Sequence, residues 1–463
     1  MRSCVATAPT TESTGVSRSV DVAELVRLKV VPRTVPLLVV SYLFAHLDRI
    51  NIGFSKFQMS QDLGLSETTY GFGAGLFFIA YALFGVPGNM MLERFGPARW
   101  IALIMVVWGC LSSSVSLVTE TWQFYLLRFL LGVAEAGFFP GILVYVNRWF
   151  PVRHRARVTA LFVLAVPCAG LLGGPISGAI LEWFDGFGGV RGWQWMFLME
   201  GAPVVLLGLA VRFGLPETIE RAAWLGADER AALGEALADE PESPERCTLR
   251  DVCTHGDTWR LVAIYFAVML AVNTLAFWMP SLIRSAGVDN DGRVGLLSAL
   301  PYLMGCVAMI AVGTSSDRHG ERRWHTCLPL WGSAAGLVLV ALVPSDLPPE
   351  FGVPLVMGGL TVAAMGANTS LPMFWQLPAA FLCRRTQSVG IALISSCGNV
   401  AAFCAPYFIG WVRDVTGGAS MGLLILSVFI AAGGYMILTL PAAVVNPRAD
   451  FGGGRSVAIR GRS

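Results

Sequence analysis

Twelve apolar runs, each long enough to cross a lipid bilayer, constrain this 463-residue chain more than any other feature. A spanning helix needs about 20 predominantly apolar residues. Only 14% of the residues are charged, where a soluble globular protein has about 25%, and the mean hydropathy is +0.62. The sequence therefore predicts an all-α polytopic membrane protein. The expected spans are 33–55, 70–92, 99–118, 122–146, 156–182, 194–214, 259–284, 293–313, 323–343, 353–382, 386–411 and 418–442.

The basic residues of the short loops indicate the orientation of the chain. With the N-terminus inside, the inner loops hold eleven arginines and the outer loops hold five basic residues. Because positive charge concentrates on the cytoplasmic side, we expect both termini in the cytoplasm. The polar start of the chain shows no cleavable signal peptide. The inner residues are Arg94, Arg99, Arg148, Arg153, Arg155, Arg157, Arg318, Arg322, Arg323, Arg384 and Arg385, and the outer ones are Lys56, Arg191, Arg284, Arg293 and Arg413.

The spans are expected to form two bundles of six helices. Residues 33–214 form the first bundle and residues 259–442 the second, joined by a cytoplasmic central loop at 215–258. Cytoplasmic tails are expected at 1–32 and 443–463. Within the central loop, residues 217–237 have amphipathic helical spacing, which fits either a helix on the membrane surface or a solvated linker helix.

Two loops repeat at a constant offset of 224 residues. The loop after the second span carries Glu93, Arg94, Gly96 and Arg99, and the loop after the eighth span carries Asp317, Arg318, Gly320 and Arg323. This repeat indicates a duplicated six-helix unit, the parallel-repeat architecture of major facilitator transporters. Charges at the inner ends of helices can hold one conformation through ion pairs and dipole contacts, so Glu93, Arg94, Asp317 and Arg318 are predicted gating residues. They also serve as ordinary topogenic charge.

The chain from about 35 to 442 resembles the major facilitator superfamily and, more narrowly, its anion:cation symporter family. The motifs that carry the resemblance are 47–54 (LDRINIGF), 128–141 (RFLLGVAEAGFFPG), 149–157 (WFPVRHRAR), 173–175 (GGP), 372–375 (PMFW) and 398–399 (GN). That family moves organic anions such as sugar acids, tartrate and aromatic carboxylates. The resemblance implies a multi-pass protein of the bacterial inner or plasma membrane.

Four charged residues fall at mid-membrane depth, all in the first half of the chain. Asp48 and Arg49 lie in the first span, and Arg128 and Glu135 in the fourth. A charge at the centre of a membrane helix costs at least about 2.5–3.5 kcal/mol, so these residues must be paired, face water or bind a ligand. One reading is a structural quartet with two salt bridges. The resemblance implies instead that Asp48 and Glu135 couple to protons and that Arg49 and Arg128 engage the substrate.

Several polar and aromatic residues are further candidates for substrate binding. His46 lies three residues before Arg49 and so near its helical face, and Tyr81 lies in the middle of the second span. Asn399 matches a motif of the resembling family, and Trp375 lies in the tenth span. Each has a packing alternative, because polar side chains also hold membrane helices together. Asn273, Asn368 and Gln376 have the same two readings, and Glu200 is assigned to packing or an interfacial ion pair.

These features predict a secondary active transporter that imports an organic carboxylate by proton symport through alternating access. Proton-independent uniport or exchange of the same anions is the alternative, and an organic-acid receptor is less favoured. An enzyme is not expected, since the sequence contains no nucleophile triad or nucleotide-binding loop. The ten cysteines show no metal-type spacing and are read as small apolar residues. No cofactor, metal or nucleic acid is expected, and the protein is expected to act as a monomer.

Overall fold

A computed structural model describes residues 21–238, 256–344, 346–381 and 387–446. These residues are helical apart from short connections, and twelve helical stretches are long and apolar enough to cross a membrane. The predicted all-α fold with twelve spans is confirmed. The distal parts of both tails, part of the central loop, and Arg384 and Arg385 lie outside the described residues.

The first half of the chain forms the helices α2 to α8. They are α2 (Val31–Leu63), α3 (Glu67–Phe95), α4 (Pro97–Ser114), α5 (Thr121–Glu135), α6 (Phe138–Trp149), α7 (Val152–Trp183) and α8 (Gly192–Gly214). The short α1 (Val22–Leu25) continues through a π-helical turn at Val26–Val30 into α2, so the first span runs from Val22 to Leu63 and is longer than expected.

The second half forms α11 to α18, after the linker helix α9 (Ala227–Ala238). They are α11 (Gly256–Ser285), α12 (Asp291–His319), α13 (Arg323–Leu342), α14 (Pro349–Phe374), α15 (Pro378–Phe381), α16 (Gln387–Thr416), α17 (Ser420–Leu438) and α18 (Ala442–Val445). The expected tenth span, 353–382, is shorter than predicted: α14 ends at Phe374, and α15 follows as a separate turn.

The expected fourth span is confirmed as one stretch, Thr121–Trp149, which contains a short break between α5 and α6. The break lies at Ala136–Gly137, directly after Glu135. Pro140 has no backbone N–H, so the helix would lose the hydrogen bond to residue 136. Gly137 is also confined, because a Cβ there would overlap the Trp100 indole. The sequence contained both signals, but apolar length alone predicted one continuous helix.

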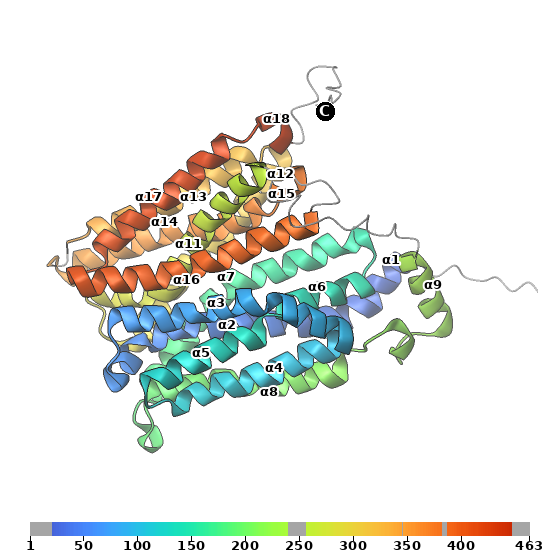
Figure 1. The fold of residues 1–463 in the computed structure, drawn as a ribbon, viewed down its shortest axis with the longest axis horizontal. Helices are drawn as coiled ribbons and strands as arrows, with labels where there is room; N and C mark the ends of the chain where they lie inside the picture. Colours follow the sequence, from blue (N-terminus) through green and yellow to red (C-terminus); the bar gives the residue numbers. More distant parts are fainter. Residues whose placement is uncertain (1–20, 239–255, 345, 382–386, 447–463) are drawn as a thin grey trace, which may run out of the picture.

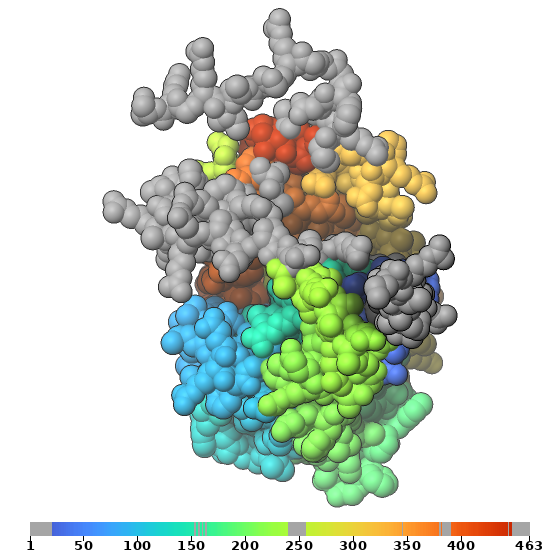
Figure 2. Space-filling model, turned by 90° about the vertical axis from the view of Figure 1, so that its right-hand side faces the viewer, coloured from blue at the N-terminus to red at the C-terminus, as the bar shows by residue number. Residues whose placement is uncertain are grey.

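The helices run side by side in two bundles (Figure 1). The bundle of α2 to α8 is coloured blue to green, and the bundle of α11 to α17 yellow to red. Helices α1, α9 and α18 lie at one end of the molecule, named here the tail end, with α1 and α9 on the right and α18 at the top of Figure 1. The far end carries the turn between α2 and α3. Figure 2 views the tail end, with the first bundle below the second.

Glycines bring the two bundles into close contact near the far end. A Cβ at Gly71 would overlap the carbonyl of Pro406, and one at Gly410 the carbonyl of Glu67, where α3 meets α16. Gly174 and Gly295 meet in the same way between α7 and α12. Small residues allow such backbone approach between membrane helices. The far end is therefore closed.

The side chains of α3 become more exposed toward the tail end. Gly75 on α3 meets Phe403 of α16. Val86 is eleven residues further along and points to nearly the same side of α3, since successive residues turn by about 100°. Its side chain is 71% exposed, and Leu83 and Met90 are each 63% exposed. We read this difference as separation of α3 from α16 toward the tail end.

Candidate functional site

An ion pair between Arg49 and Glu135 joins α2 to the end of α5. Arg49 donates to Glu135 Oε2 from Nε at 3.0 Å and from Nη2 at 2.8 Å. Arg49 lies near the middle of α2, and Glu135 is the last residue of α5. The other carboxylate oxygen of Glu135, Oε1, is buried and accepts no hydrogen bond within the described residues. Half of this carboxylate is therefore left without a donor.

The two partners differ in their access to solvent. The Arg49 side chain is 21% exposed, whereas that of Glu135 is fully buried. The guanidinium also lies over the rings of Phe77 and Tyr81, each centroid 5.3 Å away. Aromatic faces attract such cations. Arg49 thus forms part of an accessible surface at mid-membrane, and it shields Glu135 behind it.

Arg128 is buried beside this pair but is held differently. It is 1% exposed, donates from Nη2 to the carbonyl of Ala74 at 3.2 Å and lies over Phe77 at 5.2 Å. Its Nε has no acceptor and the side chain forms no ion pair within the described part of the chain. A buried guanidinium with a free donor can accept an anionic ligand at low cost, because its desolvation is already complete.

Asp48 forms no ion pair with either arginine among the described residues, and neutral donors hold its carboxylate. Its Oδ2 accepts from the Trp108 indole at 3.0 Å, and its Oδ1 accepts from the Ser112 hydroxyl and from Asn51 at 3.3 Å. The quartet with two salt bridges is therefore only half present: Glu135 occupies Arg49, while Asp48 is held by neutral donors from α2 and α4. Sequence spacing could not reveal this, since adjacent residues on a helix face different neighbours.

Glu200 on α8 is a buried carboxylate, 4% exposed. Its Oε1 accepts from the Ser177 hydroxyl of α7 at 2.7 Å, and its Oε2 has no donor. It forms no ion pair with any described residue, so of the two expected roles only packing between helices fits.

His46 and Tyr81 lie on either side of Arg49. His46 Nδ1 is 3.1 Å from the carbonyl of Tyr42 on its own helix, and its ring packs edge-on against Tyr42 at 4.5 Å. Tyr81 stacks near Phe77 and faces Arg49. Both side chains are partly exposed. They are thus placed where a ligand of Arg49 would pass.

The second bundle contributes an aromatic group rather than charge. Trp375 lies 4.9 Å from Tyr265 and 5.5 Å from Phe374, ring to ring. Asn399 is partly exposed and follows Gly398, where a Cβ would overlap the Tyr265 ring. This close contact brings the Asn399 segment of α16 against the aromatic group.

Two of the other amide side chains of the second bundle donate hydrogen bonds to backbone carbonyls of their own helices. Asn273 donates to the carbonyl of Met269 at 2.8 Å, and Asn368 donates to Ala364 at 2.9 Å. Gln376 lies 3.9 Å from the Met373 sulfur, and its Oε1 is buried without a donor among the described residues. Packing roles therefore fit Asn273 and Asn368.

The first repeated loop is organised by a residue outside its motif. Glu93 and Arg94 are exposed at the end of α3. Glu217, which follows α8, accepts from the Arg99 backbone N–H at 3.2 Å and lies 3.9 Å from Arg148. It fills the space beside Gly96, whose positive φ of 83° favours glycine. Glu217 is a residue that motif reading missed.

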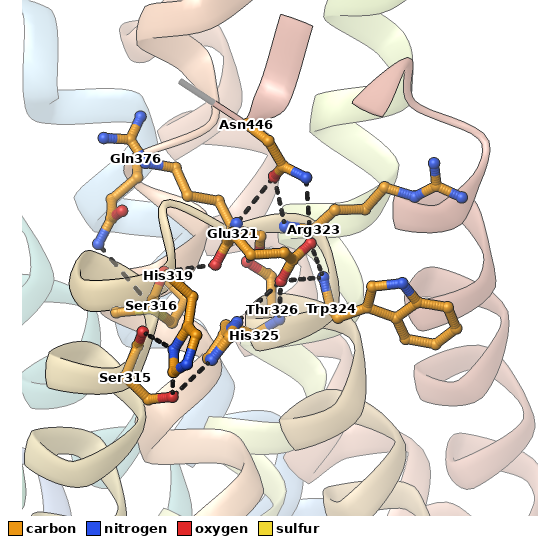
Figure 3. A network of polar contacts seen from close by, with 12 residues as sticks. Ser315, Ser316, His319, Glu321, Arg323, Trp324, His325, Thr326, Gln376 and Asn446 are labelled. Carbon is orange, nitrogen blue, oxygen red and sulfur yellow. Dashed lines mark hydrogen bonds and ion pairs between the residues drawn. The ribbon is translucent and has the colours of Figure 1, made fainter. Parts of the chain in front are cut away.

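The second repeated loop is closed by Glu321 (Figure 3). Its carboxylate accepts from the backbone N–H of Trp324 at 2.8 Å and from the His325 ring at 2.8 Å. Asn446, just after α18, donates to Glu321 at 3.3 Å and accepts from the Arg322 N–H at 2.8 Å. Asp317 and Arg318 remain exposed at the end of α12. The C-terminal segment is thereby tied to the start of α13.

Glu321 is stabilised as a carboxylate. Partial burial acts to raise its pKa, but the N–H groups of Trp324 and His325, the His325 ring and Asn446 outweigh burial and hold the pKa below its usual value. A carboxylate at a helix N-terminus gains from the helix dipole as well.

Twelve spans in two bundles, closed at one end, with a charged pair at mid-membrane, define a secondary transporter and not an enzyme. The family model of the Major Facilitator Superfamily matches residues 38–406. The chain belongs to the Major Facilitator Superfamily.

Relatives match over nearly the whole chain. It is 42% identical to NicT of Pseudomonas putida, whose name proposes metabolite transport, over 90% of this chain and 95% of that protein. It is 41% identical to an Agrobacterium vitis protein whose name proposes tartrate transport, over 93% and 94%. A quinolone resistance transporter of Acinetobacter baumannii is 36% identical, over 88% and 92%. These relatives are consistent with the anion:cation symporter resemblance.

Among solved structures, a D-xylose–proton symporter has the same fold. The two structures superpose with a TM-score of 0.69 over 89% of this chain and 98% of the symporter, and their sequences are 16% identical. A bacterial homologue of the lysosomal transporter Spinster, in an inward-facing conformation, has a TM-score of 0.68 at 15% identity, covering 88% and 95%. At these identities the likeness establishes the fold alone.

Proposed function

We propose that the protein imports a small organic carboxylate together with protons by alternating access. The observation that carries the proposal is the pair of Arg49 and Glu135: a partly exposed guanidinium held by a buried carboxylate with one unpartnered oxygen. Arg suits a carboxylate ligand because its planar guanidinium can bind both oxygens. The name of the tartrate relative favours the same class of substrate.

Proton coupling follows from the competition for Arg49. While Glu135 is ionised, it occupies Arg49 and the site is neutral. Burial favours the protonated form of a carboxylic acid, and a proton on Glu135 releases Arg49 for the substrate carboxylate. In this scheme Glu135 takes the proton, because it is the carboxylate that occupies Arg49, and Asp48 is the second candidate for proton coupling.

The remaining candidate residues surround this pair. Arg128 would offer its free Nε to the bound anion, with Tyr81 and His46 beside Arg49. Trp375 and Asn399 would complete the site from the second bundle when the bundles approach. With both termini in the cytoplasm, the closed far end faces outward and the structure is inward-facing. The exposed Glu93, Arg94, Asp317 and Arg318 lie at the tail end, where they would form gating contacts when that end closes.

In the proposed topology, the two bundles at 33–214 and 259–442 span the membrane. The tails at 1–32 and 443–463 and the central loop at 215–258 lie in the cytoplasm. The bacterial inner membrane and a monomeric unit fit the relatives and the single-chain site. Exchange or uniport of the same anion needs no proton. Drug export is a separate candidate because of the name of the quinolone relative, but a charged pair near the accessible surface favours an anion.

The test uses purified protein in liposomes that contain a pH-sensitive dye. Tartrate, sugar-derived acids and aromatic carboxylates are added outside in turn. We expect lumenal acidification that depends on one class of anion and is lost in Glu135→Gln. Glu200→Gln is the matched control, since Glu200 is equally buried but pairs with no arginine. Anion movement without acidification would replace symport by exchange or uniport, and no movement of any carboxylate would refute the assignment.

A further inference from the structure

A cavity with several charged residues in its wall lies at the far end, between the two bundles. It has a volume of about 430 Å³, is open on one side, and is lined by parts of α2, α3, α7, α11, α12 and α16. The charged residues of its wall are Lys56, Arg284, Arg413, Glu67 and Asp291. Three cations therefore face two carboxylates, which leaves an excess of one positive charge among the lining residues. The volume falls in the range of small-molecule sites, about 300–1,000 Å³.

Lys56 is the most buried of these charges. Its side chain is 6% exposed and pairs with Glu67 of α3. The ammonium lies 4.1 Å from the centroid of the Trp278 ring and 5.3 Å from that of Tyr70. An ammonium has three donors, and Glu67 is its single acceptor among the described residues. The remaining donors are available to an anion in the cavity.

Two arginines of the second bundle line the other side of the cavity. Arg284 pairs with Asp291 and lies over Phe57 at 3.9 Å. Arg413 Nη1 is 3.8 Å from Glu67 Oε2, but this buried nitrogen forms no hydrogen bond within the described residues. The Ser60 hydroxyl on the cavity wall is likewise buried without a partner there. The cavity thus presents unused donors from both bundles.

A series of cation–π contacts extends from this cavity to Arg49. Lys56 follows Arg49 by seven residues, two turns or about 10 Å along the same face of α2. Tyr70 and Phe77 have the same spacing on α3. Lys56 lies over Tyr70, and both Arg128 and Arg49 lie over Phe77. Positive charge therefore continues along the α2–α3 interface from the far end to mid-membrane.

We propose that this cavity is an outer recruiting site that binds the substrate carboxylate before it reaches Arg49. This inference rests on the proposed import of a carboxylate. The anion takes the place of Glu67 at Lys56 and Arg413. It thereby weakens the ionic contact between Glu67 of α3 and Arg413 of α16. The same two helices are also joined by Asp414, which accepts from the Thr68 N–H at 2.8 Å. Binding at the recruiting site would favour opening of the far end.

The first test compares the two directions of transport. Tartrate uptake is measured in right-side-out and inside-out membrane vesicles containing wild type, Lys56→Gln or Arg413→Gln. We expect the KM from the outer side to rise about tenfold, with the KM from the inner side within twofold of wild type. Arg293→Gln is the matched control, because Arg293 is an exposed cation at the same end outside the cavity wall. An equal shift from both sides, or none, would overturn the recruiting site.

A second measurement separates this site from the central one. Ser60→Cys is labelled from outside with an anionic thiosulfonate reagent, and the labelled peptide is quantified by mass spectrometry. Tartrate or benzoate should slow the labelling of Ser60→Cys at least threefold. The same protection is expected in the double variant Ser60→Cys/Arg49→Ala. In the double variant Ser60→Cys/Lys56→Gln the protection should be abolished. Absence of protection refutes the outer site. Protection without any transport by wild-type protein would instead refute the proposed function and leave the anion site standing.

Discussion

The two bundles differ in where they bury charge. All five buried charged side chains among the described residues belong to the first half: Asp48, Lys56, Arg128, Glu135 and Glu200. The described buried polar side chains of the second half are uncharged, as in Asn273, Thr369 and Ser370. The repeat in the fold is therefore not a repeat in chemistry.

This difference separates two tasks within one duplicated architecture. Buried charge in a membrane is costly and is retained where it binds ions or substrate. The first bundle buries its charged side chains around Arg49 and Glu135. The second bundle supplies aromatic surface at Trp375 and the adjacent segment of α16 at Asn399. In the proposed transport cycle, the first bundle would provide the charged groups and the second bundle an uncharged surface opposite them.

Removing Arg49 should have the largest effect. In Arg49→Ala, Glu135 loses its one ion-pair partner among the described residues. Leaving a buried charge unpaired costs about 3–5 kcal/mol unless the group takes up a proton. We expect carboxylate uptake to fall at least 100-fold and the midpoint of thermal unfolding in detergent to fall unless the pH is low. Arg260→Ala, which breaks an exposed pair with Asp257, is the control and should change neither. Wild-type uptake by Arg49→Ala would remove the charged pair from the mechanism.

Replacing Asp48 should have an intermediate effect. In Asp48→Asn, an amide NH2 donor replaces one carboxylate oxygen. The Trp108 N–H or the Ser112 hydroxyl then faces another donor and loses its acceptor. The cost of a buried unsatisfied group is about 1–3 kcal/mol, to be measured as a lower free energy of unfolding. Asn273→Ala in the second bundle is the comparison, because Asn273 bonds only to its own helix, and we expect less than about 1 kcal/mol there. Equal losses in both variants would erase the contrast between the halves.

The smallest effect concerns Glu321 at the surface of the second bundle. Its folded pKa lies below the ordinary value of 4.5, so the stabilisation is present above pH 4.5 and is lost as the pH falls through the lowered pKa. Glu321→Gln should therefore reduce stability by about 1 kcal/mol near pH 6, with the difference from wild type shrinking toward pH 3. Thermal unfolding at both pH values measures this. A difference that grows on acidification would contradict the contacts described for Glu321.

Much of the fold could be predicted because membrane insertion is encoded locally. The spans follow from apolar length, and the duplication follows from the loops at Glu93 and Asp317. Hydropathy correctly gives one span at Thr121–Trp149, but it carries no information on the break after Glu135, because two helices in line have the same apolar length as one.

The sequence by itself determined twelve spans, their pairing into two halves, and which residues bring charge into the membrane, because these depend on composition and periodicity along one helix. Only the tertiary structure decided the partners: Glu135 with Arg49, Asp48 with Trp108 and Ser112, and Lys56 with Glu67, Tyr70 and Trp278. The reason is geometric. Neighbours such as Asp48 and Arg49 point about 100° apart on α2, so their roles depend on which helices pack against each side.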